Sequence, residues 1–314
     1  MGSLHGWIGK DLGPDLSRRA IDEMLAEYGG PVVARNPGNT NDLGWLAVCS
    51  GLYTTSSHST DDIRAAVVGA PRWSDKGLAE IAAREGHAAS LIRAYREHGT
   101  DLLARLHGPF ALAILHGRDA VVAVDRIGIH RLSYAFRDGL FVFSTSTGSV
   151  ARHPLIDRER DPQAIFNYFY FHDIPSPGSF FLGVEKLLPA QYVQLRDGHL
   201  HKDFYWRLHY HDTDQPSYDT LKQRLHGTLR QAVAEDSGDA PVATFLSGGT
   251  DSSTITGILA EQRQEPVDSY SIGFSAEEFD EMHYARVAAG HYGTTPHEYY
   301  LTPDDILEAI PVIT

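Results

Sequence analysis

A serine- and glycine-rich stretch at residues 247–253 has the residue types of an anion-binding loop. It reads Ser-Gly-Gly-Thr-Asp-Ser-Ser. Glycines let the backbone approach an anion without a Cβ in the way, and serine hydroxyls add hydrogen-bond donors. Asp251 places one carboxylate beside these donors, which makes sense if Mg²⁺ lies between it and bound phosphates. The sequence therefore predicts a site for a phosphate chain and a magnesium ion.

The residues on either side of this loop predict a strand and a helix. Residues 242–246 form an apolar run typical of a buried strand, and residues 252–262 have helical periodicity. The first N–H groups of a helix lack intrahelical partners and carry the positive end of its dipole, so they can bind phosphate oxygens. An ordinary turn is the alternative, because glycine and serine are also typical of turns. The lysine of the Walker A pattern is missing from the loop, which excludes a kinase-type or GTPase-type loop.

Length and composition indicate a two-domain cytoplasmic protein. The chain has 314 residues, of which 42% are hydrophobic, so it can bury normal cores. A net charge of −14 argues against a nucleic-acid partner, and we expect no signal peptide or membrane span. Cys49 is the single cysteine, so we expect a buried thiol and a reducing compartment. No His/Cys cluster has the spacing of a zinc site.

The first two thirds of the chain predict a mixed sheet with helices on its faces. Helices are expected over residues 77–95 and over residues 161–171, where Asp161 can cap and proline follows. Asp197-Gly198 predicts a hairpin turn. Short apolar or alternating runs predict strands over residues 43–52, 110–115, 120–124, 140–144, 192–195 and 200–204.

The last third alternates between helix and strand. A helix at residues 217–234 precedes the loop, and strands at 268–274 and 297–301 follow it, each succeeded by a helix. Such alternation predicts a parallel, doubly wound sheet, in which ligands bind at the carboxyl ends of the strands. Phe245, Leu246 and Ile272 would then flank an adenine, although core strand residues would look the same.

The pattern Ser-Gly-Gly-x-Asp-Ser after a hydrophobic strand resembles the PP-loop of the class B asparagine synthetase family. In that family the loop holds the pyrophosphate of ATP, and the aspartate helps to hold Mg²⁺. The resemblance therefore implies ATP and Mg²⁺ as cofactors and Asp251 as the metal ligand. The implied nucleotide-site residues are Phe245, Leu246, Ser247, Gly248, Gly249, Asp251, Ser252, Ser253 and Ile272. Phe279-Asp280-Glu281 resembles the family's Phe-Asp-Glu, although exposed carboxylates at a helix start would look the same.

Segments of the first half resemble the glutaminase domain of the same family. The clearest are Gly-Pro-Phe-Ala-Leu-Ala-Ile-Leu at residues 108–115 and Gly-Val-Glu-Lys-Leu-Leu-Pro at residues 183–189. The resemblance implies an αββα sandwich of the N-terminal-nucleophile amidotransferase type over residues 1–208. A polar linker at residues 209–217 would join it to the N-terminal part of a PP-loop domain over residues 218–314.

The expected glutaminase residues are missing from the matching positions. A glutaminase of this type needs cysteine as its first mature residue, because the free α-amine assists the thiol. The chain starts Met-Gly-Ser, so removal of the methionine would expose Gly2. Val68, Gly69 and Ala70 stand where the family has Asn-Gly-Glu, and His87 stands where it has an aspartate. We therefore expect a degenerate glutaminase domain with no complete catalytic set.

The resemblance implies a ligase that adenylates a small-molecule or peptide carboxylate, releases pyrophosphate and forms an amide. Asparagine synthetase is the primary expectation, and β-lactam synthetases or lasso-peptide cyclases are the relatives whose amine does not come from glutamine. The family's second acidic loop is not in the chain. We therefore expect a fragment, a half completed by a partner chain or homodimer, or the product of a truncated gene. A non-catalytic ATP-binding or scaffold protein is the alternative.

Overall fold

The computed structural model describes residues 2–26, 32–37, 44–51, 53–210, 216–238, 240–275 and 280–313. They fall into two compact units, Met1–His209 and Tyr210–Thr314. Residues 211–215 of the predicted linker, and Phe279 of the predicted Phe-Asp-Glu segment, lie outside the described residues.

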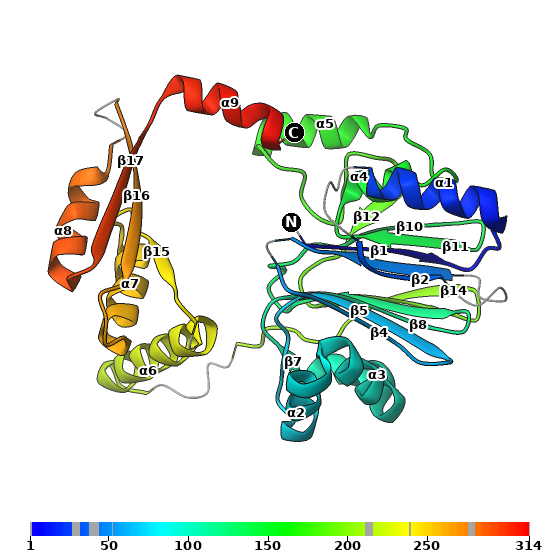
Figure 1. The fold of residues 1–314 in the computed structure, drawn as a ribbon, viewed down its shortest axis with the longest axis horizontal. Coiled ribbons are helices and arrows are strands. Elements are labelled where there is room, and N and C mark those ends of the chain that lie inside the picture. Colours follow the sequence, from blue (N-terminus) through cyan, green and yellow to red (C-terminus); the bar gives the residue numbers. More distant parts are fainter. Residues whose placement is uncertain are drawn as a thin grey trace. The chain divides into compact units, whose positions relative to one another are not determined.

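The first unit is built on two six-stranded sheets (Figure 1). The first sheet has the order β12 (Val184–Lys186), β10 (Ser133–Arg137), β11 (Leu140–Ser144), β1 (Ser3–Ile8), β3 (Gly44–Cys49) and β2 (Val32–Pro37). The second has the order β14 (His199–Phe204), β13 (Gln191–Arg196), β9 (Asp119–Val124), β8 (Phe110–His116), β5 (Ile63–Gly69) and β4 (Thr55–Ser59). The described pairings in both sheets are antiparallel.

Three layers of apolar side chains hold this unit together. Leu4, Val68 and Phe143 belong to the core between the two sheets. Helices α1 (Gly13–Leu25) and α4 (Thr147–Arg152) lie on the outer face of the first sheet (Figure 1), where Trp7 and Met24 share one apolar cluster. Helices α2 (Lys76–Glu85) and α3 (His87–His98) cover the second sheet.

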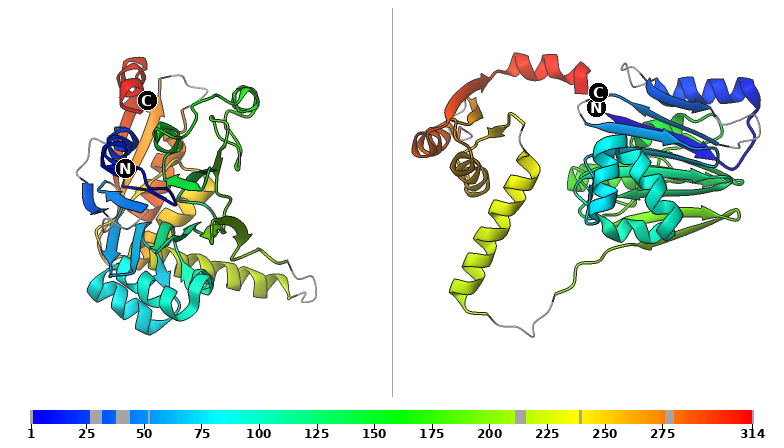
Figure 2. Two further views of the ribbon diagram at one scale, coloured as in Figure 1. Left: turned by 90° about the vertical axis from the view of Figure 1, so that its right-hand side faces the viewer. Right: turned by 60° about the horizontal axis from the view of Figure 1, so that its bottom comes forward.

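The predicted αββα sandwich is therefore confirmed, and Figure 2 shows the same layers from two further sides. The expectation of a mixed sheet, which came from the strand pattern alone, is wrong for this unit, whose two sheets are antiparallel. Its central strands are apolar on both faces because helices cover one side and the second sheet covers the other. Parallel strands give the same continuous apolar runs, so the runs did not determine strand direction.

Two local features of this unit follow from single residues. The helix predicted over residues 77–95 is divided into α2 and α3 at Gly86, whose φ of +93° is a conformation that suits glycine. Helix α5 (Pro162–Phe171) begins as predicted, since the Asp161 carboxylate accepts a hydrogen bond of 2.9 Å from the Gln163 N–H. The remaining short elements of the unit are β6 (Arg72–Trp73), the 3₁₀ helix η1 (Gly99–Arg105) and β7 (Leu106–His107).

The second unit contains the predicted parallel sheet. Strands β15 (Ala243–Phe245), β16 (Asp268–Phe274) and β17 (Thr295–Leu301) are parallel and lie in that order. The helices of this unit are α6 (Tyr218–Ser237), α7 (Thr250–Gln262), α8 (Met282–Tyr292) and α9 (Pro303–Ile313). Helix α7 begins two residues earlier than predicted, which places Asp251 within its first turn.

Helices α7 and α8 pack on the same face of this sheet. Thr256 of α7 donates a hydrogen bond of 3.1 Å to Thr244 of β15, and Arg286 of α8 binds Glu298 of β17. Among the described residues the opposite face stays open. Its exposed apolar side chains are Phe245, Tyr270, Ile272, Phe274 and Tyr299.

Candidate functional site

The predicted anion loop connects the carboxyl end of β15 to the start of α7. Gly249 is the N-cap residue of this helix, and no side chain caps it. The first helical hydrogen bond runs from the Ser253 N–H to the Gly249 carbonyl at 3.0 Å. The N–H groups of residues 250–252 precede that bond, so the helix itself gives them no partner. The structure therefore places a helix N-terminus where the sequence predicted phosphate binding.

Serine hydroxyls form hydrogen bonds within the loop. The Ser252 Oγ accepts a hydrogen bond of 3.3 Å from the Ser247 N–H, and the Ser247 Oγ accepts one of 3.3 Å from the Gly249 N–H. The two hydroxyls lie 3.1 Å apart. The Ser253 Oγ is buried and has no hydrogen-bond partner in the described part of the chain. A buried hydroxyl without a partner costs stability, so this atom is a group that a bound phosphate could satisfy.

Position 248 requires glycine, both because of its backbone conformation and because of its close neighbours. Its φ is +83°, in the left-handed region. A Cβ at this position would lie 2.4 Å from the carbonyl carbon of Tyr284 in α8. The loop therefore packs directly on the backbone of α8. Leu246, next to the loop, and Met282 of α8 belong to one small apolar cluster.

The acidic residues near the loop have different roles. Asp251 is exposed in the first turn of α7 and can reach a ligand from there. Asp280 instead accepts hydrogen bonds of 3.2 Å from the Phe274 N–H and 3.3 Å from the Met282 N–H, so it braces the connection from β16 to α8. Within the described ranges, no three His, Cys, Asp or Glu residues form a group that could hold a metal ion.

The predicted adenine-flanking residues differ in accessibility. The Leu246 side chain is 1% exposed and belongs to the core beneath α8. Phe245 is 82% exposed and Ile272 is 53% exposed. Phe245 pairs with Tyr270 in the parallel register, so Phe245, Tyr270 and Ile272 lie on one face of the sheet. Apolar surface for a base is thus available from Phe245 and Ile272, whereas the Leu246 side chain is buried and both of its backbone polar groups are bound by β16.

One contact to the loop comes from a residue outside the recognised motif. Ser271 in β16 donates a hydrogen bond of 2.7 Å to the carbonyl of Leu246. The sequence carries a signal for it, since Ser269 and Ser271 alternate with the exposed Tyr270 and Ile272 along the strand. A polar residue on the buried side of a strand needs a hydrogen-bond partner.

Gly2 and Gly69, two of the expected glutaminase positions, lie against Tyr53 and His130. A Cβ on Gly2 would lie 2.8 Å from the backbone oxygen of Tyr53, and a Cβ on Gly69 would lie 2.7 Å from Nε2 of His130. The rings of Tyr53 and His130 meet edge to face with 4.7 Å between their centroids. Val68 is fully buried. Gly2, Val68 and Gly69 themselves provide neither a nucleophilic side chain nor a carboxylate.

Two histidines of the same unit differ in burial, since His87 is half-buried and His5 is fully buried. The His87 Nδ1 is buried without a hydrogen-bond partner among the described residues, and burial lowers the pKa of His87. The His5 ring lies between the hydroxyls of Ser3 at 2.8 Å and Ser144 at 2.9 Å, and burial lowers the pKa of His5 to about 3. Ser3 is 1% exposed, so a substrate cannot reach this serine–histidine pair.

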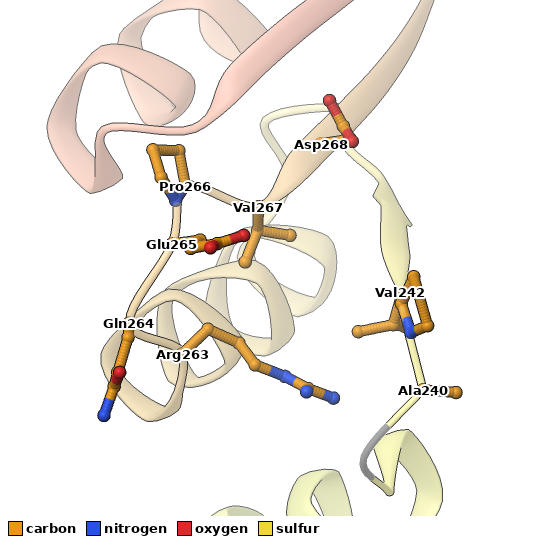
Figure 3. A pocket seen from close by; sticks show the side chains of 9 residues that line it. Ala240, Val242, Arg263, Gln264, Glu265, Pro266, Val267 and Asp268 are labelled. Carbon is orange, nitrogen blue, oxygen red and sulfur yellow. The ribbon is translucent and has the colours of Figure 1, made fainter.

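A separate hollow of about 410 Å³ lies at the other end of the parallel sheet. Figure 3 shows Val242 and Asp268, at the amino ends of β15 and β16, among its lining residues. Its Arg263 donates a hydrogen bond of 2.7 Å to the carbonyl of Gly238, at the end of α6. Ligands of parallel sheets bind at the carboxyl ends, so this hollow is not part of the loop site.

No helix in the described ranges is both long and apolar enough to cross a membrane.

Comparison with protein families gives two matches. Residues 82–206 match the glutamine amidotransferase domain, and residues 224–314 match asparagine synthase. The second match includes the loop, α7, β16 and α8.

Curated relatives include asparagine synthetases. Asparagine synthetase [glutamine-hydrolyzing] 1 of Bacillus subtilis is 28% identical over 71% of this chain and 35% of its own length. Asparagine synthetase [glutamine-hydrolyzing] 3 of the same organism is 27% identical over 69% of this chain and 38% of its own length. The chain thus spans little more than a third of these relatives. Amidase chyE of Penicillium rubens is 29% identical over 54% of this chain and 26% of its own length.

Among solved structures, the chain is similar to glutamine phosphoribosylpyrophosphate amidotransferase from B. subtilis. The TM-score is 0.40 at 12% identity, over 99% of this chain and 70% of that chain.

Proposed function

Because the chain combines a glutamine amidotransferase domain with an asparagine synthase domain, we propose that it acts in an ATP-dependent amide ligase. In the proposed reaction a substrate carboxylate attacks the α-phosphorus of ATP and pyrophosphate leaves. An amine or ammonia then attacks the acyl carbon of the adenylate, and AMP leaves. The observation that carries this proposal is the loop of residues 247–253 at the start of α7, which fits the departing pyrophosphate.

The donors of the loop fit a phosphate chain with one magnesium ion. The N–H groups of residues 250–252 and the unpartnered Ser253 hydroxyl would bind phosphate oxygens. Asp251 would hold Mg²⁺ from the first turn of α7, with phosphate oxygens and water as the remaining ligands. When bound, Mg²⁺ would offset the negative charge of the pyrophosphate as it departs.

We propose that the nitrogen does not come from glutamine. Gly2 supplies no thiol, and the side chains at Val68, Ala70 and His87 supply no carboxylate or amide. Asparagine synthetase with ammonia as the nitrogen source is the primary proposal. A ligase resembling β-lactam synthetases or lasso-peptide cyclases, with a substrate amine as the nucleophile, is the second.

We further propose that additional polypeptide, from the same chain or from a partner, completes the synthetase site. The chain spans 35% and 38% of the two B. subtilis relatives. The open face of the parallel sheet, with Phe245 at 82% exposure and Tyr299 at 54%, supports this proposal. An apolar face of this kind is the surface that another layer of a domain covers.

Isotope exchange between pyrophosphate and ATP tests the proposed function. With Mg²⁺ and the polypeptide that completes the site, the ligase should exchange label only when a carboxylate substrate is present, and aspartate is the first substrate to test. Adding ammonia should then yield AMP and an amide. ATP binding without exchange for any carboxylate would instead support the alternative of a non-catalytic nucleotide-binding scaffold.

A further inference from the structure

The residue immediately before the loop is held by β16 through both of its backbone polar groups. The Leu246 N–H donates to the Tyr270 carbonyl at 2.8 Å, which continues the pairing of β15 with β16. The Leu246 carbonyl accepts its hydrogen bond of 2.7 Å from the hydroxyl of Ser271. Ser271 is 8% exposed, so little water competes for this contact. A side chain of β16 thus fixes the point at which the backbone leaves the sheet.

This contact determines the direction of the first N–H group of the loop. The Leu246 carbonyl and the Ser247 N–H belong to one planar peptide unit, so fixing one fixes the other. The Ser247 N–H points to the Ser252 Oγ at 3.3 Å, in the first turn of α7. Without the Ser271 hydroxyl, the peptide plane could rotate and the loop donors would lose their alignment.

We propose that Ser271 is a positioning residue for the anion loop, and that its hydroxyl raises the affinity of the loop for the pyrophosphate part of a nucleotide. This inference rests on the proposed function. Ser271 does not touch the phosphates. It acts through the peptide unit between Leu246 and Ser247.

Ser269 provides a matched control on the same strand. It lies two residues before Ser271, on the same buried face, and is fully buried. Its hydroxyl lies 2.8 Å from the hydroxyl of Thr294, just before β17. Removing either hydroxyl therefore removes one buried hydrogen bond, but only one of the two bonds positions the loop.

The test compares Ser271→Ala with Ser269→Ala in the full chain. Amide hydrogen exchange is measured at residues 247–253, and calorimetry gives the dissociation constants of Mg·ATP and of inorganic pyrophosphate. In Ser271→Ala, loop exchange should rise about tenfold and both ligands should bind about tenfold more weakly, as expected for one lost hydrogen bond. Ser269→Ala should stay within about twofold of the wild type in both measurements, and Ser271→Thr, which keeps the hydroxyl, should retain most of the affinity.

Each contrary outcome has a defined meaning. Loop exchange that is equal in the two alanine variants overturns the inference, whatever the ligands do. Faster loop exchange with unchanged affinity also overturns it, because positioning would not affect binding. A wild-type chain that binds neither Mg·ATP nor pyrophosphate overturns the assignment of residues 247–253 as the phosphate site, and the claim about affinity fails with it.

Discussion

The backbone of Gly248 lies so close to Tyr284 that a Cβ on residue 248 would be 2.4 Å from the Tyr284 carbonyl carbon. The neighbouring Gly249 has more room, since its Cβ would lie 3.4 Å from the Ser247 hydroxyl. The backbone conformations also differ, because φ is +83° at Gly248, which favours glycine, and −69° at Gly249, which any residue can adopt. Two adjacent glycines of one loop therefore have different physical requirements.

Gly248→Ala should destabilise the second unit more than Gly249→Ala does. The first substitution combines a left-handed φ with a clash against backbone, which should cost about 2–4 kcal/mol in the free energy of unfolding. The second should cost about 1 kcal/mol, because alanine is a poorer N-cap residue than glycine. Urea unfolding of both variants measures the difference. Equal stability of the two would show that the loop does not pack on α8 as described.

The loop itself could be predicted from sequence because its determinants are local. Glycines, serines and the following helix lie within a few residues of one another, so the strand, turn and helix near residues 243–262 are recognisable. Asp161 as a helix cap and Asp197-Gly198 as a hairpin turn were predictable for the same reason. The αββα architecture followed from family resemblance rather than from periodicity.

What could not be predicted depends on contacts between distant residues. The break at Gly86 depends on tertiary packing, because an isolated glycine is also tolerated within a helix. Strand β1 pairs with β11, about 140 residues away, and its buried Ser3 and His5 gave no apolar pattern. The contact from Ser271 to Leu246 spans 25 residues and joins two strands, so no local motif contains it.

Gly2→Cys should not restore glutamine hydrolysis. The new side chain would meet the Tyr53 backbone oxygen, from which a Cβ at this position is only 2.8 Å away. The amide and carboxylate partners would still be missing at Val68, Ala70 and His87. Glutamate released from glutamine should stay at the level of the wild type. Release well above that level would show that the first unit retains a functional glutamine site.

The buried His5 should make stability depend on pH. Burial lowers its pKa in the folded state to about 3, against 6.5 for an ordinary histidine. Between these values the unfolded chain binds more protons, so stability falls as pH drops through this window. Lowering the pH from about 7 to about 5 should remove on the order of 1–2 kcal/mol through His5. Burial also lowers the pKa values of His87, His130 and His153, which add to the loss of stability in this range, whereas the carboxylates with lowered pKa values act mainly below it.

An NMR titration of the His5 ring tests the cause of this dependence directly. The ring signals should stay those of a neutral imidazole down to about pH 5. Denaturant unfolding at both pH values measures the accompanying loss of stability. A His5 midpoint near the ordinary value would remove the basis of the prediction, whatever the unfolding curves show.

Asp251→Asn should have opposite effects on ATP binding with and without magnesium. In the wild type, the carboxylate lies in the first turn of α7, beside the N–H groups proposed to bind phosphate. Without Mg²⁺ the carboxylate repels the anion, so the asparagine variant should bind ATP more tightly, by about two- to fivefold. With Mg²⁺ the variant loses a metal ligand and should bind about tenfold more weakly.

Asp219→Asn is the matched control, because Asp219 also lies in the first turn of a helix, α6, outside the loop. It should leave both affinities within about twofold of the wild type. The change of sign is what identifies the role of Asp251, since loss of a negative charge alone would strengthen ATP binding under both conditions. If the asparagine variant binds more tightly in Mg²⁺ as well, Asp251 is not the magnesium ligand and acts only by repelling the phosphates.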